Sequence, residues 1–279
     1  MKQLVKRIND ALAPHYPQGE VSAFARIIAT ELLGFSQTTY YLKDEVTLTP
    51  TKEEKLADAL ARLQKEEPIQ YILGYSDFCD LRFKVTPAVL IPRPETSELV
   101  QWIKTECGTA KSLLDIGTGS GCIAVSLAKL LPHMHVTAWD ISPAALEIAQ
   151  ENSRANGCNV LFEQRDILTY THTATDKFDI IVSNPPYIKE SEKEAMENNV
   201  LLWEPHLALF VPNDSPLLFY RTIAQKALTM LPAGGKLFFE INREHGAETI
   251  AMLQAMGYHD ITLRKDFAEN DRMIKAVKK

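Results

Sequence analysis

The sequence lacks the features that mark membrane-spanning and disulfide-bonded proteins. No apolar run approaches the roughly 20 residues that a membrane-spanning helix needs, and residues 1–7 lack the apolar core of a signal peptide. The four cysteines, Cys79, Cys107, Cys122 and Cys158, form no CxxC pair, which argues against a disulfide framework and against a zinc site. We therefore expect a cytoplasmic protein with reduced thiols, no metal and no membrane contact.

Internal repeats and low-complexity tracts are also missing. With 279 residues, of which 46% are hydrophobic and 24% charged, the chain has the composition of a globular protein and the length for two domains. Its 30 basic and 36 acidic residues leave a net charge of −6, which argues against a broad surface for nucleic acid. A local basic groove stays open, but we expect no direct nucleic-acid contact.

Helical spacing dominates the first 66 residues. Apolar residues recur every three or four positions in three stretches, which are Leu4 to Leu12, Phe24 to Leu32 and Leu56 to Leu63. Gly34 can end the second helix. The pattern predicts a small helical domain over residues 1–66.

The pattern changes between residues 67 and 95. Short alternating runs around Ser76 and Asp77 indicate a β-hairpin, so we interpret this segment as a β-hairpin linker. Pro92 and Pro94 then keep the backbone extended before a helix that we expect from Thr96. The second domain is predicted to cover residues 96–279.

Strands and helices alternate from residue 112 onward. Apolar runs of strand length lie at residues 113–116, 136–139, 160–163, 178–183, 236–241, 258–263 and 273–277. Helical segments between them are expected from Cys122, from Pro143, over residues 217–230 and from Glu244. This alternation predicts an α/β domain with a mainly parallel, Rossmann-like, seven-stranded sheet that is covered by helices on both faces.

A glycine-rich turn follows the first of these strands. Gly117, Gly119 and Gly121 form a GxGxG pattern, and Cys122 stands where a dinucleotide-binding GxGxxG motif needs glycine or alanine. Asp140 ends the next strand 23 positions after Gly117, where a carboxylate can accept hydrogen bonds from both hydroxyls of a ribose. A nicotinamide-dependent enzyme stays open as an alternative, because glycine loops are common.

The loop and the acidic residue together resemble those of methyltransferases that use S-adenosylmethionine, whose cofactor has a ribose and an adenine but no pyrophosphate. The resemblance implies that Gly117, Thr118, Gly119, Ser120, Gly121 and Asp140 bind this cofactor, with Asp115 below the loop. It also places Asp166 at the adenine edge and Ile167 on the adenine face. The alternative for Asp166 is that it caps a turn.

The tetrapeptide Asn184-Pro185-Pro186-Tyr187 ends the fourth strand. The prolines fix φ and remove two N–H donors, so the turn presents carbonyl oxygens. The Asn184 side-chain oxygen and the Pro185 carbonyl can then accept hydrogen bonds from both N–H groups of a planar NH2 group, while Tyr187 stacks on it. Because carboxyl ends of parallel strands share one edge, this motif should face the glycine loop across one crevice. The alternative is a rigid turn that only ends the strand.

Longer segments resemble the HemK/PrmC-type protein-(glutamine-N5) methyltransferases, which modify peptide chain release factors. The matching segments are residues 67–74, 90–96, 115–121, 183–188, 204–209 and 266–272. The resemblance implies that residues 1–66 help to dock the release factor, and that the substrate is the glutamine of its Gly-Gly-Gln loop. Asn184, Pro185 and Tyr187 would be catalytic, Asn184 to Tyr187 would bind substrate, Asn184 would also touch the cofactor, and the enzyme would be a monomer.

Several alternatives remain at this point. The same tetrapeptide serves adenine-N6 or guanine-N2 methyltransferases of nucleic acid and an enzyme that methylates a glutamine of a ribosomal protein. A non-catalytic module that binds S-adenosylmethionine is a further possibility. Arg93 and Glu95 either line the crevice or pair with each other to anchor the linker, and His206 is either a general base or a surface residue.

Overall fold

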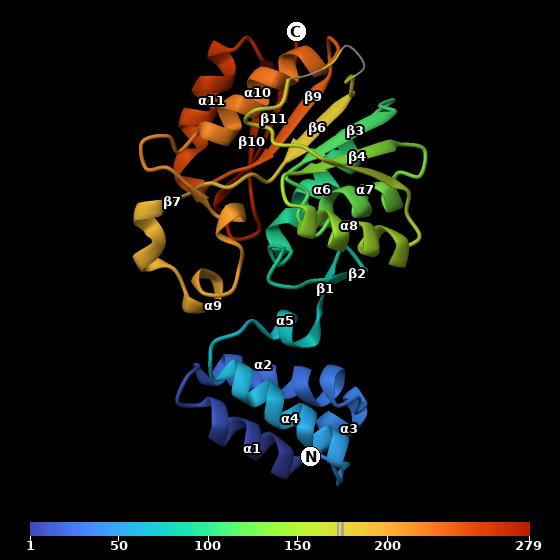
Figure 1. Cartoon of the computed structure of the whole chain (residues 1–279), viewed down its shortest axis with the longest axis vertical. Coiled ribbons are helices and arrows are strands. Elements are labelled where there is room, and N and C mark those ends of the chain that lie inside the picture. The colour runs from blue at the N-terminus through green and yellow to red at the C-terminus, as the bar shows by residue number, and fades with distance from the viewer. Residues whose placement is uncertain (172, 174–175) are drawn as a thin grey trace. The chain divides into compact units, whose positions relative to one another are not determined.

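The structure, a computed structural model, describes residues 1–171, 173 and 176–279. The chain forms two compact units (Figure 1). The first, here called the helical unit, comprises Met1–Gly74 together with Glu197–Trp203. The second, the sheet unit, comprises Tyr75–Met196 and Glu204–Lys279. The chain therefore leaves the sheet unit once, after Met196, and re-enters it at Glu204.

Short helices build the helical unit. They are α1 (Lys2–Leu12), α2 (Gln18–Ile27) with a π-helical continuation (Ile28–Leu32), α3 (Gln37–Leu42), α4 (Pro50–Leu63), α5 (Ile69–Leu73) and α9 (Asn198–Leu201). The helical spacing of apolar residues is what brings Leu4, Ile8 and Leu12 of α1 into one buried core with Leu56 and Leu63 of α4. Thr49 caps α4 by accepting a hydrogen bond from the Lys52 N–H.

The segment from Glu197 to Trp203 belongs to this unit through specific contacts. The Trp203 Nε1–H donates to the Lys65 carbonyl at 3.1 Å, and the Asn198 amide donates to the Glu66 carboxylate at 2.8 Å. A piece of chain that follows the Asn-Pro-Pro-Tyr motif thus completes the helical unit.

The helical unit extends further than the sequence predicts. Residues 69–73, interpreted as part of the hairpin linker, form helix α5, which begins after Pro68 and ends at Gly74 with φ at +81°. Ile69 is buried in the helical core, which explains why the compact unit runs to Gly74 rather than to residue 66. The hairpin itself is shorter than predicted and consists of β1 (Tyr75–Phe78) and β2 (Leu81–Lys84).

A seven-stranded sheet forms the centre of the sheet unit, as the alternating pattern predicts. Its spatial order is β10 (His259–Lys265), β11 (Asp271–Val277), β9 (Lys236–Glu240), β6 (Ile180–Ser183), β3 (Ser112–Ile116), β4 (His135–Asp140) and β5 (Val160–Gln164). The five strands from β9 to β5 are parallel, and β11 is antiparallel to both of its neighbours. Two further strands, β7 (Ile188–Lys189) and β8 (Phe210–Val211), pair outside this sheet.

Helices cover both faces of the sheet (Figure 1). On one face, α6 (Pro94–Glu106) and α7 (Cys122–Leu130) pack in the cluster that contains Leu113, while α8 (Pro143–Ala155) packs beside β4 and β5. On the other face, α10 (Leu218–Met230) and α11 (Gly246–Ala255) pack in the cluster that contains Leu114. Successive strand residues point to opposite faces, which is why neighbouring leucines enter different cores.

The strand order reverses at β3. From β3 the chain moves to β4 and β5 on one side and later to β6 and β9 on the other. In open parallel sheets, ligands bind beyond the carboxyl ends of the strands at such a reversal. The glycine turn after β3 and Asn184 after β6 both lie at this point.

Candidate functional site

A cavity opens at the carboxyl edge of the sheet where the strand order reverses. Among the residues that line it, those proposed from sequence are Gly117, Thr118, Gly119, Ser120, Asp140, Asp166, Ile167, Asn184, Pro185 and Pro186. Four different loops supply them, so the fold brings together residues that are far apart in the chain. In the described part of the chain, Gly121 and Tyr187 lie outside this lining, and so does Asp115, which was expected below the glycine loop.

The glycine turn adopts a conformation that only glycine tolerates well. Gly117, Gly119 and Gly121 all have positive φ, at +75°, +55° and +80°. A Cβ on Gly121 would lie 3.1 Å from the Cβ of Ala149, so a side chain there would press against α8. Gly117 and Thr118 donate their N–H groups to the Trp139 carbonyl and so fix the turn to the end of β4.

Asp140 is held at the cavity wall by the backbone. One carboxylate oxygen accepts the Gly119 N–H at 2.8 Å, and the other accepts the Ser142 N–H at 2.9 Å. Burial raises the pKa of Asp140, and the two backbone donors act in the opposite direction. The carboxylate therefore joins the glycine turn to the start of α8 in a fixed orientation.

Asp115 and Ser120 contribute buried polar atoms whose hydrogen-bonding capacity is not used. The Thr118 hydroxyl donates to Oδ2 of Asp115 at 2.7 Å, whereas Oδ1 of Asp115 and the hydroxyl oxygen of Ser120 have no partner among the described residues. Asp115 is completely buried, and burial raises its pKa to about 7. Only Ser120 belongs to the cavity lining, so of these two atoms its hydroxyl is the one that a polar ligand can reach.

Asp166 has both of the roles considered from sequence. It caps the turn after β5, because its carboxylate accepts the Leu168 N–H and the Thr169 hydroxyl, each at 2.9 Å. It also lines the cavity. Ile167 is only 8% exposed; it joins the core behind the cavity and offers an apolar surface to it.

Asn184 follows directly on a strand that is fixed from both sides. The Ser183 hydroxyl donates to the Ile116 carbonyl at 2.6 Å, which ties the end of β6 to the end of β3. Within the described residues, the Asn184 carboxamide makes no hydrogen bond, although it lies at the cavity wall. Pro185 and Pro186 continue the wall. A carboxamide in this position is ready to bind a polar ligand.

Tyr187 differs from the sequence expectation. The tetrapeptide predicts that its ring stacks on the substrate, but the ring packs against the core cluster that contains Tyr220 and lies outside the cavity lining. Burial raises its pKa, and Glu240 adds to that effect. Its carbonyl accepts the Asn242 amide at 3.3 Å. In this structure the tyrosine supports the motif from behind.

Arg93 lines the cavity and pairs with a residue that was not expected. Its guanidinium donates to Oε1 of Glu204 at 2.6 Å, whereas one of the two alternatives from the sequence was a pair with Glu95. Oε2 of Glu204 accepts the Ile91 N–H at 3.1 Å. In the described chain, neither Glu95 nor His206 belongs to the cavity lining, and the His206 ring instead meets Phe210 edge to face.

Sequence reasoning assigned no role in the site to the apolar residues of two further cavity walls. They are mainly apolar and comprise Ala88, Val89, Leu90, Ile91, Pro92, Pro205, Leu207 and Ala208. Glu204 fastens the first wall to the second. The only signal in the sequence was that both segments match the same family, at residues 90–96 and 204–209.

Comparison with known proteins places the chain in a family. The family model described as PrmC N-terminal domain matches residues 3–74, and the one described as Methyltransferase small domain matches residues 94–204. The release factor glutamine methyltransferase of Bacteroides thetaiotaomicron is 47% identical over 276 residues, which cover 99% of each chain. This chain belongs to the release factor glutamine methyltransferase family. The family member from Flavobacterium psychrophilum is 44% identical over 95% of this chain and 94% of its own.

Solved structures agree with the fold. A methyltransferase from Pyrococcus furiosus superposes with a TM-score of 0.53 over 80% of this chain and 98% of its own, at 18% identity. The hMettl16 catalytic domain, solved with the MAT2A 3′UTR hairpin 6, reaches a TM-score of 0.58 over 85% of each chain, at 17% identity. At such identities the likeness concerns the fold alone. The sequence prediction of a methyltransferase fold and of this family is confirmed, so the chain is an enzyme.

The described residues lack the features of two other classes of site. None of their helices is both long enough and apolar enough to cross a bilayer. Nor do they contain a group of three or more histidine, cysteine, aspartate or glutamate side chains that is arranged to hold a metal ion.

Proposed function

We propose that this enzyme transfers a methyl group from S-adenosylmethionine to the side-chain amide nitrogen, N5, of the glutamine in the Gly-Gly-Gln loop of peptide chain release factors. One observation carries the proposal. A single cavity brings the glycine turn and Asp140 together with Asn184 and Pro185. We infer the substrate from the names of the relatives, which are up to 47% identical to this chain.

The residues on one side of the cavity suit S-adenosylmethionine. The glycine turn lets a ligand approach the backbone closely, and Asp140 offers carboxylate oxygens to a ribose. The Ser120 hydroxyl, which has no partner among the described residues and belongs to the cavity lining, suits the charged amino group of a methionine moiety. Ile167 offers an apolar face to an adenine. When bound, this cofactor supplies an electrophilic methyl group, and S-adenosylhomocysteine is the product.

Asn184 and Pro185 hold the substrate amide. An amide nitrogen is a poor nucleophile because its lone pair is delocalised. The Asn184 side-chain oxygen and the Pro185 carbonyl accept hydrogen bonds from its two N–H groups, orient the nitrogen and stabilise the positive charge that develops on it. As the N–C bond forms, the C–S bond of the sulfonium breaks, and one N–H proton is then released to water. Orientation together with electrostatic complementarity of this kind can lower a barrier by several kcal/mol without a strong base.

The apolar walls set the surroundings of this step. Pro92, Pro205 and Leu207 line the cavity and reduce the access of water. In a drier site the two carbonyl acceptors act more strongly on a developing charge than they would in water. The carboxylate of Glu204 is buried and pairs with Arg93, so this pair joins the two walls.

The helical unit is proposed to help dock the release factor, as the resemblance implies. The net charge of −6 supports a protein substrate over nucleic acid. A monomeric state, a cytoplasmic location and the lack of direct nucleic-acid contact remain predictions from the sequence.

Mass spectrometry tests the proposal directly. Purified release factor is incubated with the enzyme and S-adenosylmethionine, and the peptide that contains Gly-Gly-Gln is analysed. A gain of one methyl group on its glutamine is the expected result. Transfer of labelled methyl to a ribosomal protein or to nucleic acid, with release factor unlabelled, would overturn it. An Asn184→Ala enzyme is the control, and it measures any methylation that does not depend on the proposed site.

A further inference from the structure

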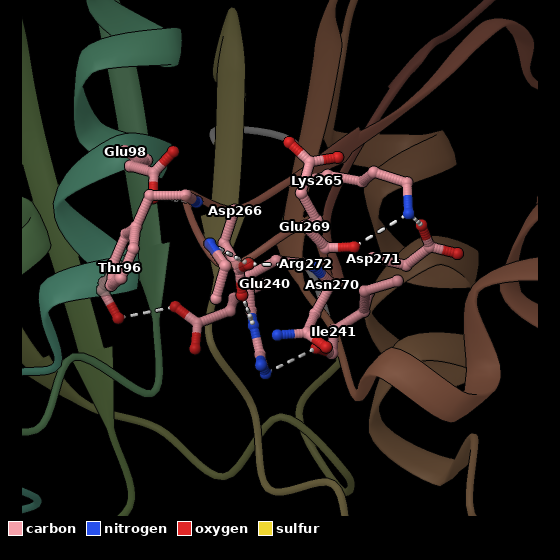
Figure 2. A network of polar contacts seen from close by, with 12 residues as sticks. Thr96, Glu98, Glu240, Ile241, Lys265, Asp266, Glu269, Asn270, Asp271 and Arg272 are labelled. Atoms are coloured by element: carbon pink, nitrogen blue, oxygen red, sulfur yellow. Dashed lines mark hydrogen bonds and ion pairs between the residues drawn. The ribbon is translucent and has the colours of Figure 1, made fainter.

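The turn between β10 and β11 contains more hydrogen bonds than a simple connection needs. Its centre is Asp266, whose side chain is 1% exposed. One carboxylate oxygen accepts the N–H groups of Ala268 and Asn270 at 2.9 and 3.0 Å, and the other accepts Nε of Arg272 at 3.0 Å. Figure 2 shows Asp266 and Arg272 at the middle of this network. A turn with three bonds to one buried carboxylate is held in a fixed conformation.

The turn is also tied to its surroundings on two sides (Figure 2). Arg272 donates a second bond to the Ile241 carbonyl at 3.4 Å, which joins the turn to the end of β9. Glu98 of helix α6 accepts the N–H of Phe267 at 3.0 Å. Next to these bonds, the Thr96 hydroxyl donates to the buried carboxyl group of Glu240 at 2.6 Å. Both neighbouring elements therefore restrain the backbone of the turn.

This fixed backbone presents Phe267 to solvent. The residue as a whole is 68% exposed. Single exposed apolar residues are common on protein surfaces, so exposure alone carries little weight. The restraint of the turn is what distinguishes Phe267. Because its backbone is already fixed, little backbone entropy is lost when the aromatic side chain enters a partner.

The turn lies at the same edge of the sheet as the cavity. Met273, near the start of β11, pairs with Glu240 at the carboxyl end of β9, so the residues before β11 extend beyond that edge. Helix α6 also connects the turn with the cavity. Thr96 of this helix lines the cavity, and Glu98, two positions later, accepts a hydrogen bond from the N–H of Phe267. A protein whose loop enters the cavity would have its adjoining surface within reach of this turn.

We propose that Phe267 is a docking anchor for the protein substrate and enters an apolar depression on the release factor beside the loop that carries the glutamine. The inference rests on the proposed function. Charge defines the partner further. Arg272 and Lys265 are paired with Asp266 and Asp271, whereas Glu98 and Glu269 add two carboxylates that form no ion pair among the described residues. We therefore expect basic side chains around the depression.

Steady-state kinetics with two substrates tests the anchor. The variants are Phe267→Ala and, as a matched control, Leu161→Ala, since Leu161 is 59% exposed on β5. Phe267→Ala should raise KM for intact release factor roughly tenfold or more, as loss of an aromatic anchor does, and leave kcat unchanged. With a short Gly-Gly-Gln peptide, which lacks the adjoining surface, both variants should match the wild type. Phe267→Tyr should restore the KM for release factor.

Two results would overturn the anchor. One is a KM for release factor that is the same for Phe267→Ala and Leu161→Ala. The other is an equal loss with release factor and with peptide, which would mean that Phe267 shapes the cavity instead. Failure of the proposed function is distinguishable, because the wild-type enzyme would then leave release factor unmethylated. If it methylates a ribosomal protein instead, the same comparison on that protein decides for or against the anchor.

Discussion

Glu204 and Arg93 lie 111 positions apart in the sequence, yet Oε1 of Glu204 accepts a 2.6 Å hydrogen bond from Nη2 of Arg93. The same carboxylate holds the Ile91 N–H through its other oxygen. The Glu204 side chain is 1% exposed and that of Arg93 is 33% exposed, so one end of the pair is shielded from water. One carboxylate thereby joins the two apolar walls of the cavity.

Glu204→Ala should lower the free energy of unfolding by about 2–3 kcal/mol. The change leaves the buried Ile91 N–H without an acceptor and removes the partner of Arg93. Glu204→Gln, which keeps an acceptor, should cost less. Denaturant unfolding measures both, with Glu194→Ala at an exposed position as the control. A Glu204→Ala value within about 0.5 kcal/mol of that control would show that the pair does not fasten the walls.

Asn184→Ala should affect turnover far more than cofactor binding. The change removes one of the two proposed acceptors for the substrate amide but leaves the glycine turn and Asp140 intact. We expect kcat to fall by a factor on the order of 10²–10³, as when one donor or acceptor to a transition state is lost. Single-turnover kinetics and calorimetry with S-adenosylmethionine separate the two effects.

Asp140→Ala provides the opposite case. It removes the carboxylate that holds the Gly119 and Ser142 N–H groups, so the affinity for S-adenosylmethionine should fall by at least about tenfold. At saturating cofactor, kcat should recover much of its value. Equal losses of affinity and turnover in both variants would contradict the division of roles between Asp140 and Asn184.

Gly121→Ala should destabilise the protein more than Gly157→Ala. Both glycines have positive φ, at +80° and +64°, so alanine is strained at either position. Only at Gly121 would the new Cβ also meet a neighbour, at 3.1 Å from the Cβ of Ala149, whereas nothing lies within 4 Å at Gly157. We expect a loss of about 1 kcal/mol at Gly157 and about 2–3 kcal/mol at Gly121. Thermal unfolding of the two variants compares them, and equal losses would mean that α8 yields easily.

Asp115 should make the cofactor-free enzyme less stable as the pH rises. Burial raises its pKa from an ordinary value of 3.8 to about 7, so the folded state keeps a proton that the unfolded state has already lost between these values. The stabilising contribution is complete below about pH 4 and is lost as the pH rises through about 7, with a slope of at most about 1.4 kcal/mol per pH unit.

The isosteric variant Asp115→Asn isolates this effect. Other groups, such as Glu240 with a pKa also raised to about 7, titrate in both proteins and cancel in the difference. The free energy of unfolding of the wild type minus that of the variant should fall between about pH 4 and pH 7 and level off above that range. Two parallel stability curves would mean that Asp115 is already ionised in the folded state.

Much of the fold was predictable because it depends on local patterns. Alternating apolar residues mark the strands, and three glycines mark the turn that faces the cavity. The pair of Glu204 and Arg93 was not predictable, since it depends on how two distant segments meet. Tyr187 was assigned to the substrate because its own neighbours in sequence suggested it, whereas the packing of α10 and the end of β9 decides where the ring lies. Helix α5 was missed because five residues are too few to show a period.

The contacts of Trp203 and Asn198 with residues 65 and 66 bear on how this enzyme can be recombined. The helical unit is not a module that ends at Gly74, because seven residues from the middle of the chain, Glu197–Trp203, are part of it. A chimera that exchanges only the first 74 residues between two relatives would combine the helices of one relative with residues 197–203 of the other. Exchange of the complete helical unit between relatives therefore requires three crossover points instead of one, and the second segment to be exchanged ends directly before Glu204.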